Sequence, residues 1–289
     1  MISSNTFFGT ECNYEDARIV VFGAPFDSTT SYRPGTRFAS RTMRAESYGL
    51  EYFSPGQNVD LSEVPFHDAG DLELPFGDTN QTIYEVGEFA ANIINQNKFP
   101  IMIGGEHVLT LAAVAAMCRF FKDIAIVHFD AHADLREDYL GVRLSHATVM
   151  RRVHELTGDN SIFQFGIRSG DKAEFEFARQ HTYLHLFDFE GLEDVIDKIK
   201  DSQVYLTIDL DVLDPSVFPG TGTPEAGGVS FIQLMNAAFK VIDGCNVIAC
   251  DLMELSPPYD PSGISTATAL KLLREMLIRI NTKLSNNVY

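Results

Sequence analysis

Short apolar segments alternate with longer amphipathic segments along the chain, and this alternation restricts the possible folds more than any other feature. The apolar segments have the length of β-strands, and their continuous apolarity predicts strands buried on both faces of a parallel sheet. We predict such strands at residues 18–22, 99–103, 124–129, 161–165, 183–187, 204–208 and 247–250, with a further short strand at 64–68.

The amphipathic segments carry the apolar spacing of helices that pack against a sheet. They cover residues 79–96, 107–121, 145–157, 171–180, 192–201, 230–243 and 262–280. Two begin with capping signals, because Asp78 precedes Gln81 by three residues and Ser230 precedes Gln233 by three. We therefore predict a single α/β domain over residues 1–289, with residues 1–17 as an N-terminal extension. The expected fold class is a three-layer α/β/α sandwich around a central, mostly parallel sheet of about eight strands.

Acidic residues outnumber basic ones, with 40 Asp and Glu against 22 Lys and Arg, and the formal net charge is -18. Such a chain repels phosphate backbones and anionic membranes, so we expect neither as a partner, and it attracts cationic ligands. No apolar segment approaches the ~20 residues that span a bilayer, and the N-terminus lacks a signal-peptide pattern. Four scattered cysteines without a C-x-x-C pair are typical of a reducing compartment, which predicts a cytoplasmic protein.

Polar side chains gather where the predicted strands end. Asp130, His132 and Asp134 follow one strand, and their alternate spacing puts them on the same side of an extended backbone. Asp209 and Asp211 follow another strand with the same spacing. Because ligands of such sheets bind beyond the carboxyl ends of the strands, we expect these side chains to converge.

A third strand end contributes His107, which follows two glycines that permit a tight turn. Four converging carboxylates repel one another unless a cation lies among them. Carboxylate and imidazole ligands without a thiolate favour a hard or borderline divalent ion such as Mn²⁺. Six ligands exceed the needs of one ion and suit two ions about 3.5–4 Å apart, which share carboxylates and activate a water.

Other polar residues have simpler interpretations. A single Asp after a strand is usually a turn or helix-cap residue, which we expect for Asp27 and Asp188. A single histidine is more often a hydrogen-bonded structural group than a ligand. We interpret the following histidines in this way: His67, His128, His154, His181 and His185.

Three motifs in order resemble the signatures of the ureohydrolase family, which comprises arginases, agmatinases and their relatives. They are GGEH at 104–107, DAHAD at 130–134 and TIDLDVLDP at 207–215. Supporting segments are GAPFD at 23–27, RPG at 33–35, PGTGTPE at 219–225 and MELSP at 253–257. The resemblance covers residues 19–277, and LSH at 144–146 and FGIRSG at 165–170 are most similar to bacterial agmatinases. It implies the arginase-like version of the predicted fold.

The resemblance also implies roles for the candidate residues. One Mn²⁺ would be held by His107, Asp130, Asp134 and Asp209, and a second by Asp130, His132, Asp209 and Asp211, with Asp130 and Asp209 bridging the two ions of each subunit. A hydroxide between the ions would attack the guanidinium carbon of the substrate. Asp134 would pass a proton to the departing amine, and His146 would act as an acid/base group near the mouth of the cleft.

Substrate binding is implied for Glu254, which would pair with the guanidinium group, and for His146 and Glu225. Each has an alternative interpretation. Glu254 would otherwise cap a helix or bind an arginine, and His146 would be a polar contact at a helix start. Glu225 lies in a glycine-rich loop, where a solvated carboxylate is common.

Substrate choice should depend on residues 135–145, which lack the Asn and Ser pattern by which arginases recognise an amino acid. Glu137, Asp138 and Tyr139 would receive a cationic amine, which favours agmatine and its hydrolysis to putrescine and urea. Alternatively, Arg136 or Arg143 would hold the carboxylate of 4-guanidinobutanoate or a formimino acid. Arginine also stays open as a substrate.

Two other classes of protein are weighed against this interpretation. A non-catalytic metal-binding scaffold would be favoured by a missing ligand or a missing His146, and all are present. A deacetylase of related fold would use a single zinc site. Family members are commonly trimers or hexamers, so we expect a homo-oligomer that binds a small cationic guanidine.

Overall fold

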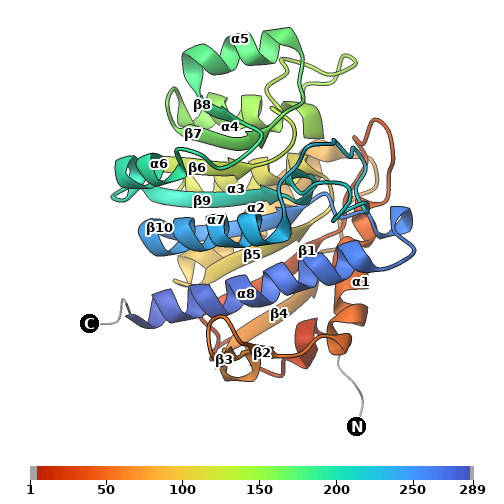
Figure 1. Cartoon of the computed structure of the whole chain (residues 1–289), viewed down its shortest axis with the longest axis vertical. Helices are drawn as coiled ribbons and strands as arrows, with labels where there is room; N and C mark the ends of the chain where they lie inside the picture. The colour runs from red at the N-terminus through yellow and green to blue at the C-terminus, as the bar shows by residue number, and fades with distance from the viewer. Residues whose placement is uncertain (1–4, 287–289) are drawn as a thin grey trace.

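Across residues 5–286, which the computed structural model describes, eight parallel strands form one sheet in the order β4-β1-β5-β10-β9-β6-β7-β8 (Figure 1). The strands are β1 (Ile19–Ala24), β4 (Phe66–Asp71), β5 (Phe99–Gly104), β6 (Ile124–Phe129), β7 (Ile162–Ile167), β8 (Tyr183–Leu186), β9 (Gln203–Asp209) and β10 (Asn246–Met253). The predicted sheet is confirmed, and the short strand expected at 64–68 is β4, displaced toward its C-terminal side.

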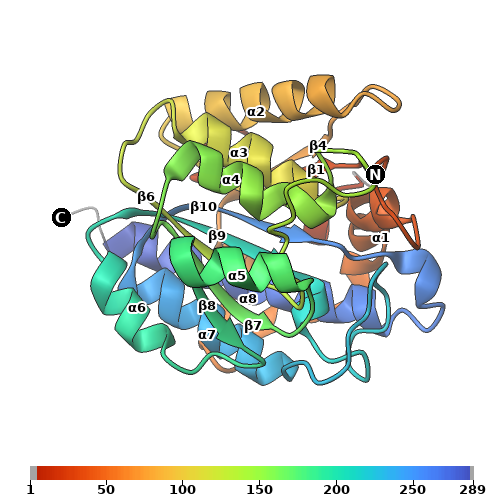
Figure 2. The ribbon, with the colours of Figure 1, turned by 90° about the horizontal axis from the view of Figure 1, so that it is seen from above.

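Helices cover both faces of the sheet, which confirms the three-layer sandwich (Figure 2). One apolar core lies between the sheet and α1 (Ala39–Glu46), α6 (Leu192–Ile199), α7 (Phe231–Gly244) and α8 (Ile264–Asn286). A second core lies between the sheet and α2 (Thr79–Asn95), α3 (Thr110–Met117), α4 (Val149–Thr157) and α5 (Lys172–His181). Four strands, β1, β5, β6 and β7, are buried throughout, as their continuous apolar runs predicted. The run at 183–187 was expected to be buried on both faces, but it forms the edge strand β8, which is partly exposed because only one neighbouring strand covers it.

The capping predictions hold at the level of single hydrogen bonds. Asp78 accepts from Gln81 N at 3.0 Å at the start of α2. Ser230 and Gln233 form the full reciprocal capping box at the start of α7. Each cap satisfies backbone N–H groups that the first helical turn leaves without intrahelical partners.

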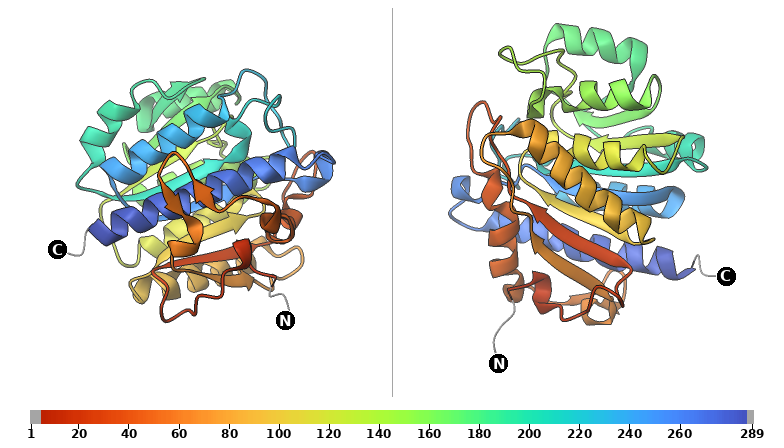
Figure 3. Two further views of the ribbon diagram at one scale, coloured as in Figure 1. Left: turned by 60° about the horizontal axis from the view of Figure 1, so that its bottom comes forward. Right: turned by 180° about the vertical axis from the view of Figure 1, so that it is seen from behind.

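Helix α1 and a pair of short strands were not predicted from the sequence. Helix α1 presents buried Ser40 and Arg44 beside its few apolar residues, so its sequence lacks a clear apolar face. The short antiparallel pair β2 (Phe53–Ser54) and β3 (Val59–Asp60) lies against α8, where Ser54 Oγ donates to Glu275 Oε2 at 2.7 Å (Figure 3, left). Two predicted helices also begin with a 3₁₀ turn, η5 (His107–Leu109) before α3 and η6 (His146–Thr148) before α4.

Strand order positions the polar residues. β5, β10, β9 and β6 are consecutive neighbours in the middle of the sheet. Their ends are in register, because Met253 pairs with Asp209 and Phe129 pairs with Ile208. The residues that follow these four strands therefore meet at one edge. Within the described part of the chain, no helix is both long and apolar enough to cross a membrane.

Candidate metal centre and substrate pocket

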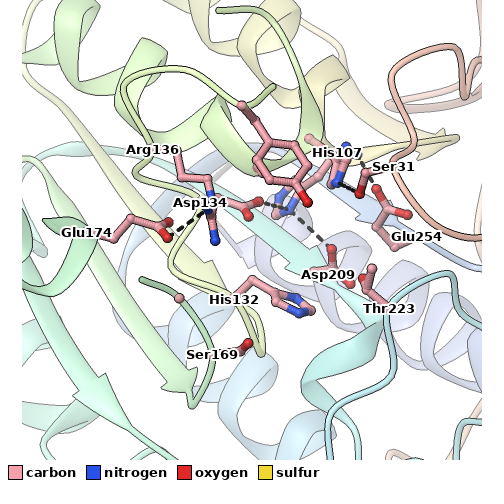
Figure 4. A pocket seen from close by; sticks show the side chains of 14 residues that line it. Ser31, His107, His132, Asp134, Arg136, Ser169, Glu174, Asp209, Thr223 and Glu254 are labelled. Carbon is pink, nitrogen blue, oxygen red and sulfur yellow. Dashed lines mark hydrogen bonds and ion pairs between the residues drawn. The ribbon is translucent and has the colours of Figure 1, made fainter. Parts of the chain in front are cut away.

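His107 lies at the centre of the first cluster of polar side chains (Figure 4). Its Nδ1 atom is 3.1 Å from Asp130 Oδ2, 3.2 Å from Asp209 Oδ2 and 3.3 Å from Asp134 Oδ2. All four residues are buried, and among the residues described no hydrogen-bond partner is aligned with this nitrogen. One imidazole nitrogen facing three carboxylates is the arrangement of ligands that share a cation.

Hydrogen bonds behind His107 determine which ring nitrogen carries the proton. Thr110 Oγ1 donates to Asp251 Oδ2 at 2.7 Å, so in the 3.3 Å contact between Thr110 and Thr207 the proton comes from Thr207. Thr207 Oγ1 therefore accepts from His107 Nε2 at 2.9 Å. With its proton on Nε2, a neutral His107 directs the lone pair of Nδ1 at the carboxylates. Metal-binding histidines are commonly oriented in this way by a partner on the other nitrogen.

His132 forms a second cluster beside the first. Its Nδ1 lies 3.0 Å from Asp211 Oδ2 and 3.5 Å from Asp130 Oδ1. The backbone N–H of Asp211 donates to Asp209 Oδ1 at 2.9 Å, and this hydrogen bond holds the Asp209 carboxylate beside Asp211. Asp130 thus contacts both histidines, and the six predicted ligands come together in space.

The charges of these side chains fit two divalent cations. Burial and the neighbouring Asp130 raise the pKa of Asp134 to about 7. Burial, Asp211 and Asp130 raise the pKa of Asp209 well above its ordinary value. Four ionised aspartates carry a charge that two divalent ions would balance, and such ions would keep the carboxylates deprotonated.

Two of the predicted residues adopt backbone conformations that are unusual for side chains with a Cβ. Asp134 has a φ of 53° and Glu254 a φ of 64°, both in the left-handed region. Such residues concentrate at functional sites, where the surrounding structure holds them. For Glu254 the restraints are its own N–H, which donates to Gly105 O at 3.1 Å, and its Oε1, which accepts from His107 N at 2.7 Å.

A cavity of about 160 Å³ opens above the two clusters. Candidate ligands and predicted catalytic residues line it together with residues from four loops. The lining residues are Ser31, His107, His132, Asp134, Arg136, Tyr139, His146, Ala147, Ser169, Gly170, Glu174, Asp209, Thr223 and Glu254. At its base, burial and the charge of Glu106 raise the pKa of Glu254 well above its ordinary value, so a cation beside Glu254 would be stabilised there.

His146 lies at the wall of this pocket and is held by one loop. Its backbone N–H donates to Thr29 Oγ1 at 3.2 Å, and its Nε2 is 3.2 Å from Ser31 Oγ. Burial, followed by the neighbouring His132, lowers the pKa of His146 to about 4. The ring is therefore neutral at pH 7 and able to accept a proton.

Most of the charged residues at 135–145 are already paired. Glu137 Oε2 is 2.8 Å from Arg151 Nη2, and Arg143 Nη2 is 2.9 Å from Glu155 Oε1. Asp138 accepts from the N–H of Gly141 at 3.1 Å. None of Glu137, Asp138 and Arg143 lines the cavity, whereas the remaining two candidates, Arg136 and Tyr139, do.

Arg136 and Glu225 lie at the outer part of the site. Arg136 lies 3.1 Å from Asp171 Oδ2 and 3.3 Å from Glu174 Oε2, so two carboxylates compensate its charge. Glu225 lies one residue behind the cavity wall, where its Oε1 accepts from Ser169 Oγ at 3.0 Å. The structure thus brings Glu254 and His146 to the cavity surface and sets Glu225 behind it.

Two buried residues beside the ligands were not predicted to belong to the site. His128 was interpreted as a structural group, and both of its ring nitrogens are indeed hydrogen-bonded, but one partner is Asp130 Oδ2 at 2.8 Å. Its position two residues before Asp130 on β6 was the available signal. Glu106 accepts from Thr29 N at 3.0 Å and from Thr29 Oγ1 at 2.8 Å, a contact across 77 positions that no local pattern indicates.

The remaining side chains that we interpreted as structural have partners of that kind. Asp27 accepts from Gly35 N at 2.8 Å in a turn, and Asp188 accepts from Glu190 N at 2.9 Å. His67 Nδ1 bonds to Cys12 O at 2.8 Å, and His185 Nε2 to Asp188 Oδ1 at 2.9 Å.

A parallel sheet that gathers aspartates and histidines at the ends of neighbouring strands, below a small polar cavity, defines a metal-dependent hydrolase. Residues 17–278 match the model of the arginase family, and the chain belongs to this family. The resemblance inferred from the three motifs is therefore confirmed.

Individual relatives and solved structures of known name resemble the chain over most of its length. An agmatinase of Bacillus subtilis is 42% identical over 280 residues, which are 96% of each chain. A guanidinobutyrase of Pseudomonas aeruginosa is 34% identical and matches 88% of this chain and 84% of its own. The crystal structure of an agmatine ureohydrolase of Thermoplasma volcanium superimposes with a TM-score of 0.90 at 32% identity, covering 100% of this chain and 98% of that one.

Proposed function

We propose that the protein is a binuclear manganese hydrolase that cleaves agmatine to putrescine and urea. The observation that carries the proposal is the position of His107 Nδ1, 3.1–3.3 Å from three carboxylates, in contact with a second cluster through Asp130. The identity to agmatinases over nearly the whole chain supports the same reaction.

The proposed ligand sets follow the two clusters. One Mn²⁺ would be held by His107, Asp130, Asp134 and Asp209, and the other by Asp130, His132, Asp209 and Asp211. When bound, the ion pair supplies a nucleophile by lowering the pKa of a water, and it polarises the substrate. The oxygen-rich ligand set is the support for manganese over softer ions.

The remaining steps belong to side chains of the cavity. Glu254 would pair with the guanidinium group and orient its carbon toward the clusters. Asp134, which lines the cavity, would pass a proton to the departing amine. His146, which is neutral at pH 7, would exchange protons between the cavity and solvent.

Charge at the outer part of the cavity favours agmatine over a substrate with a carboxylate. Arg136 is the cation of the wall, and its pairing with Asp171 and Glu174 leaves this corner with an excess of negative charge. Glu225 lies behind Ser169 and adds to it. A distal ammonium group would be attracted here, whereas the carboxylate of 4-guanidinobutanoate would be repelled.

The decisive experiment measures urea release by the Mn²⁺-loaded protein given agmatine, arginine and 4-guanidinobutanoate side by side. We expect agmatine to give the highest kcat/KM. If only 4-guanidinobutanoate is hydrolysed, the assignment of agmatine as the substrate is wrong, but the proposed metal-dependent hydrolysis still holds. No urea from any substrate, with both ions bound, would instead favour a metal-binding scaffold.

The cellular form of the protein is also proposed here. We propose a cytoplasmic homo-oligomer, a trimer or a hexamer, on the strength of the family resemblance. Light scattering of the purified protein would measure the assembly, and a monomeric mass would contradict it.

A further inference from the structure

Three polar side chains meet at the ends of two helices, away from the cavity. His154 lies in the last turn of α4, His181 is the last residue of α5, and Asp159 lies in the loop between α4 and β7. Both helices lie toward the β8 edge of the sheet, as Figure 1 shows. None of the three residues lines the cavity, to which α5 contributes Glu174 from its first turn.

The three side chains converge on one point, where both imidazoles are hydrogen-bonded to the same carboxylate oxygen. His154 Nε2 is 2.8 Å and His181 Nδ1 is 2.7 Å from the same atom, Asp159 Oδ1. The three candidate ligand atoms lie within 4.8 Å of one another. The Asp159 side chain is 56% exposed, so an ion from solvent can reach it.

Packing and backbone contacts hold these groups in place before any ligand binds. The His181 ring stacks on Phe177 at 4.3 Å between centroids, and the His154 ring meets the same phenyl ring edge-on at 5.0 Å. Gly158 N donates to His154 O, and Asn160 N to His181 O, each at 2.8 Å. The loop that carries Asp159 is therefore fastened to both helices, and little conformational entropy remains to be lost on binding.

The donor types differ from those of the catalytic clusters. Two imidazoles and one carboxylate suit Zn²⁺, and also Ni²⁺ and Cu²⁺, better than they suit Mn²⁺. Arg151 packs on the same phenyl ring, with its guanidinium carbon 3.7 Å from the centre of the Phe177 ring. Its charge is compensated, because Arg151 Nη2 pairs with Glu137 at 2.8 Å.

We propose that His154, Asp159 and His181 form a separate mononuclear site for Zn²⁺ that joins the ends of α4 and α5. The ion would take His154 Nε2, His181 Nδ1 and an oxygen of Asp159, with water in the remaining position. Each neutral imidazole then carries its proton on the ring nitrogen that faces away from the ion. The ion would replace the two hydrogen bonds to Asp159 by ligand bonds, and because it would join the ends of α4 and α5 in the folded state, its binding should stabilise the fold.

The test uses full-length, Mn²⁺-loaded protein without a polyhistidine tag, equilibrated with Zn²⁺ and then freed of unbound metal. Both metals are counted per subunit, which separates a new site from exchange at the catalytic clusters. We expect wild type to keep its Mn²⁺, to gain one Zn²⁺ and to melt at a higher temperature. The double variant His154→Asn/His181→Asn should gain no Zn²⁺.

Two further variants keep the proposal falsifiable. Asp159→Asn retains an oxygen that accepts both hydrogen bonds, so it should fold, yet it should bind Zn²⁺ at least about 10-fold more weakly. His185→Asn removes a half-buried histidine from a set with a single imidazole and should behave as wild type. Equal Zn²⁺ in wild type and the double variant, or Zn²⁺ gained only as Mn²⁺ is lost, would overturn the proposal.

Discussion

His128 Nε2 donates a hydrogen bond to Asp130 Oδ2 at 2.8 Å, while its Nδ1 accepts from Gln164 Nε2 at 3.0 Å. The Gln164 amide has a fixed orientation, because the same nitrogen also donates to Ala133 O and its oxygen accepts from Thr182 Oγ1. An amide nitrogen only donates, so the proton of His128 is on Nε2. Burial lowers the pKa of His128, which keeps the ring neutral.

This bond leads to the first prediction. Asp130 contacts both histidines of the candidate metal centre, and a residue that orients a ligand typically contributes 10–100-fold to metal affinity, so we expect His128→Asn to weaken Mn²⁺ binding by about that factor. Titration of the metal-free protein with Mn²⁺ measures it. His67→Asn, which removes a histidine from β4 that bonds to a backbone carbonyl, serves as the control. Unchanged Mn²⁺ affinity in His128→Asn would show that Asp130 needs no such support.

Neutralising a shared carboxylate should remove both metal and activity. Asp209→Asn keeps an oxygen to accept from Asp211 N but loses the charge that faces His107 at 3.2 Å. We expect the variant to retain less Mn²⁺ and to lose at least about 1,000-fold in kcat, since metal ions supply several kcal/mol of transition-state stabilisation. Bound-metal analysis is the direct readout. Asp214→Asn, in the loop that follows, should retain wild-type metal, and wild-type metal in Asp209→Asn would count against the ligand assignment.

Glu254→Gln should separate substrate binding from metal binding. The glutamine can still accept from His107 N but no longer forms charge-assisted hydrogen bonds with a guanidinium group. We expect full Mn²⁺ content with kcat/KM for agmatine lowered at least about 100-fold. Glu225→Gln is the companion variant, with a smaller loss because Glu225 acts through Ser169. Unchanged kinetics in Glu254→Gln would remove this residue from the substrate site.

The buried carboxylate of Glu275 should make stability depend on pH. Burial alone would raise its pKa, but hydrogen bonds from Arg274, Lys271 and Ser54 outweigh burial and lower the pKa to about 2. A folded-state pKa below the ordinary value means that the stabilisation is present above pH 4.5 and is lost as the pH falls toward 2.

Glu275→Gln should therefore destabilise the fold by about 2–3 kcal/mol at pH 7 and by progressively less below pH 4.5. Thermal or urea unfolding of both proteins across this range measures the difference. Glu176→Gln is the control, because its 3.5 Å pair with Lys172 is exposed and contributes little. A difference that stays constant from pH 7 to pH 3 would contradict the assignment.

The sequence by itself determined the strands, most helices and the six candidate ligands. Buried parallel strands require unbroken apolar runs, and ligands at a strand end require alternate positions such as Asp209 and Asp211, so both leave local patterns. Glu254 and His146 were predicted because each lies in a short motif, MELSP at 253–257 and LSH at 144–146.

Only the tertiary structure decided which charged side chains are available to contact a substrate. Glu137 and Arg143 were candidate substrate contacts, yet both form ion pairs with residues of α4. Glu225 lies behind Ser169 and accepts its hydrogen bond. Similarly, His154 and His181 are 27 positions apart and meet at one carboxylate because α4 and α5 end side by side. Such pairings depend on how helices pack over a sheet, and no local spacing records them. Functional residues that follow one strand can be predicted from their spacing in the sequence. Contacts between residues of separate elements form only when the chain folds, so the sequence pattern does not predict them.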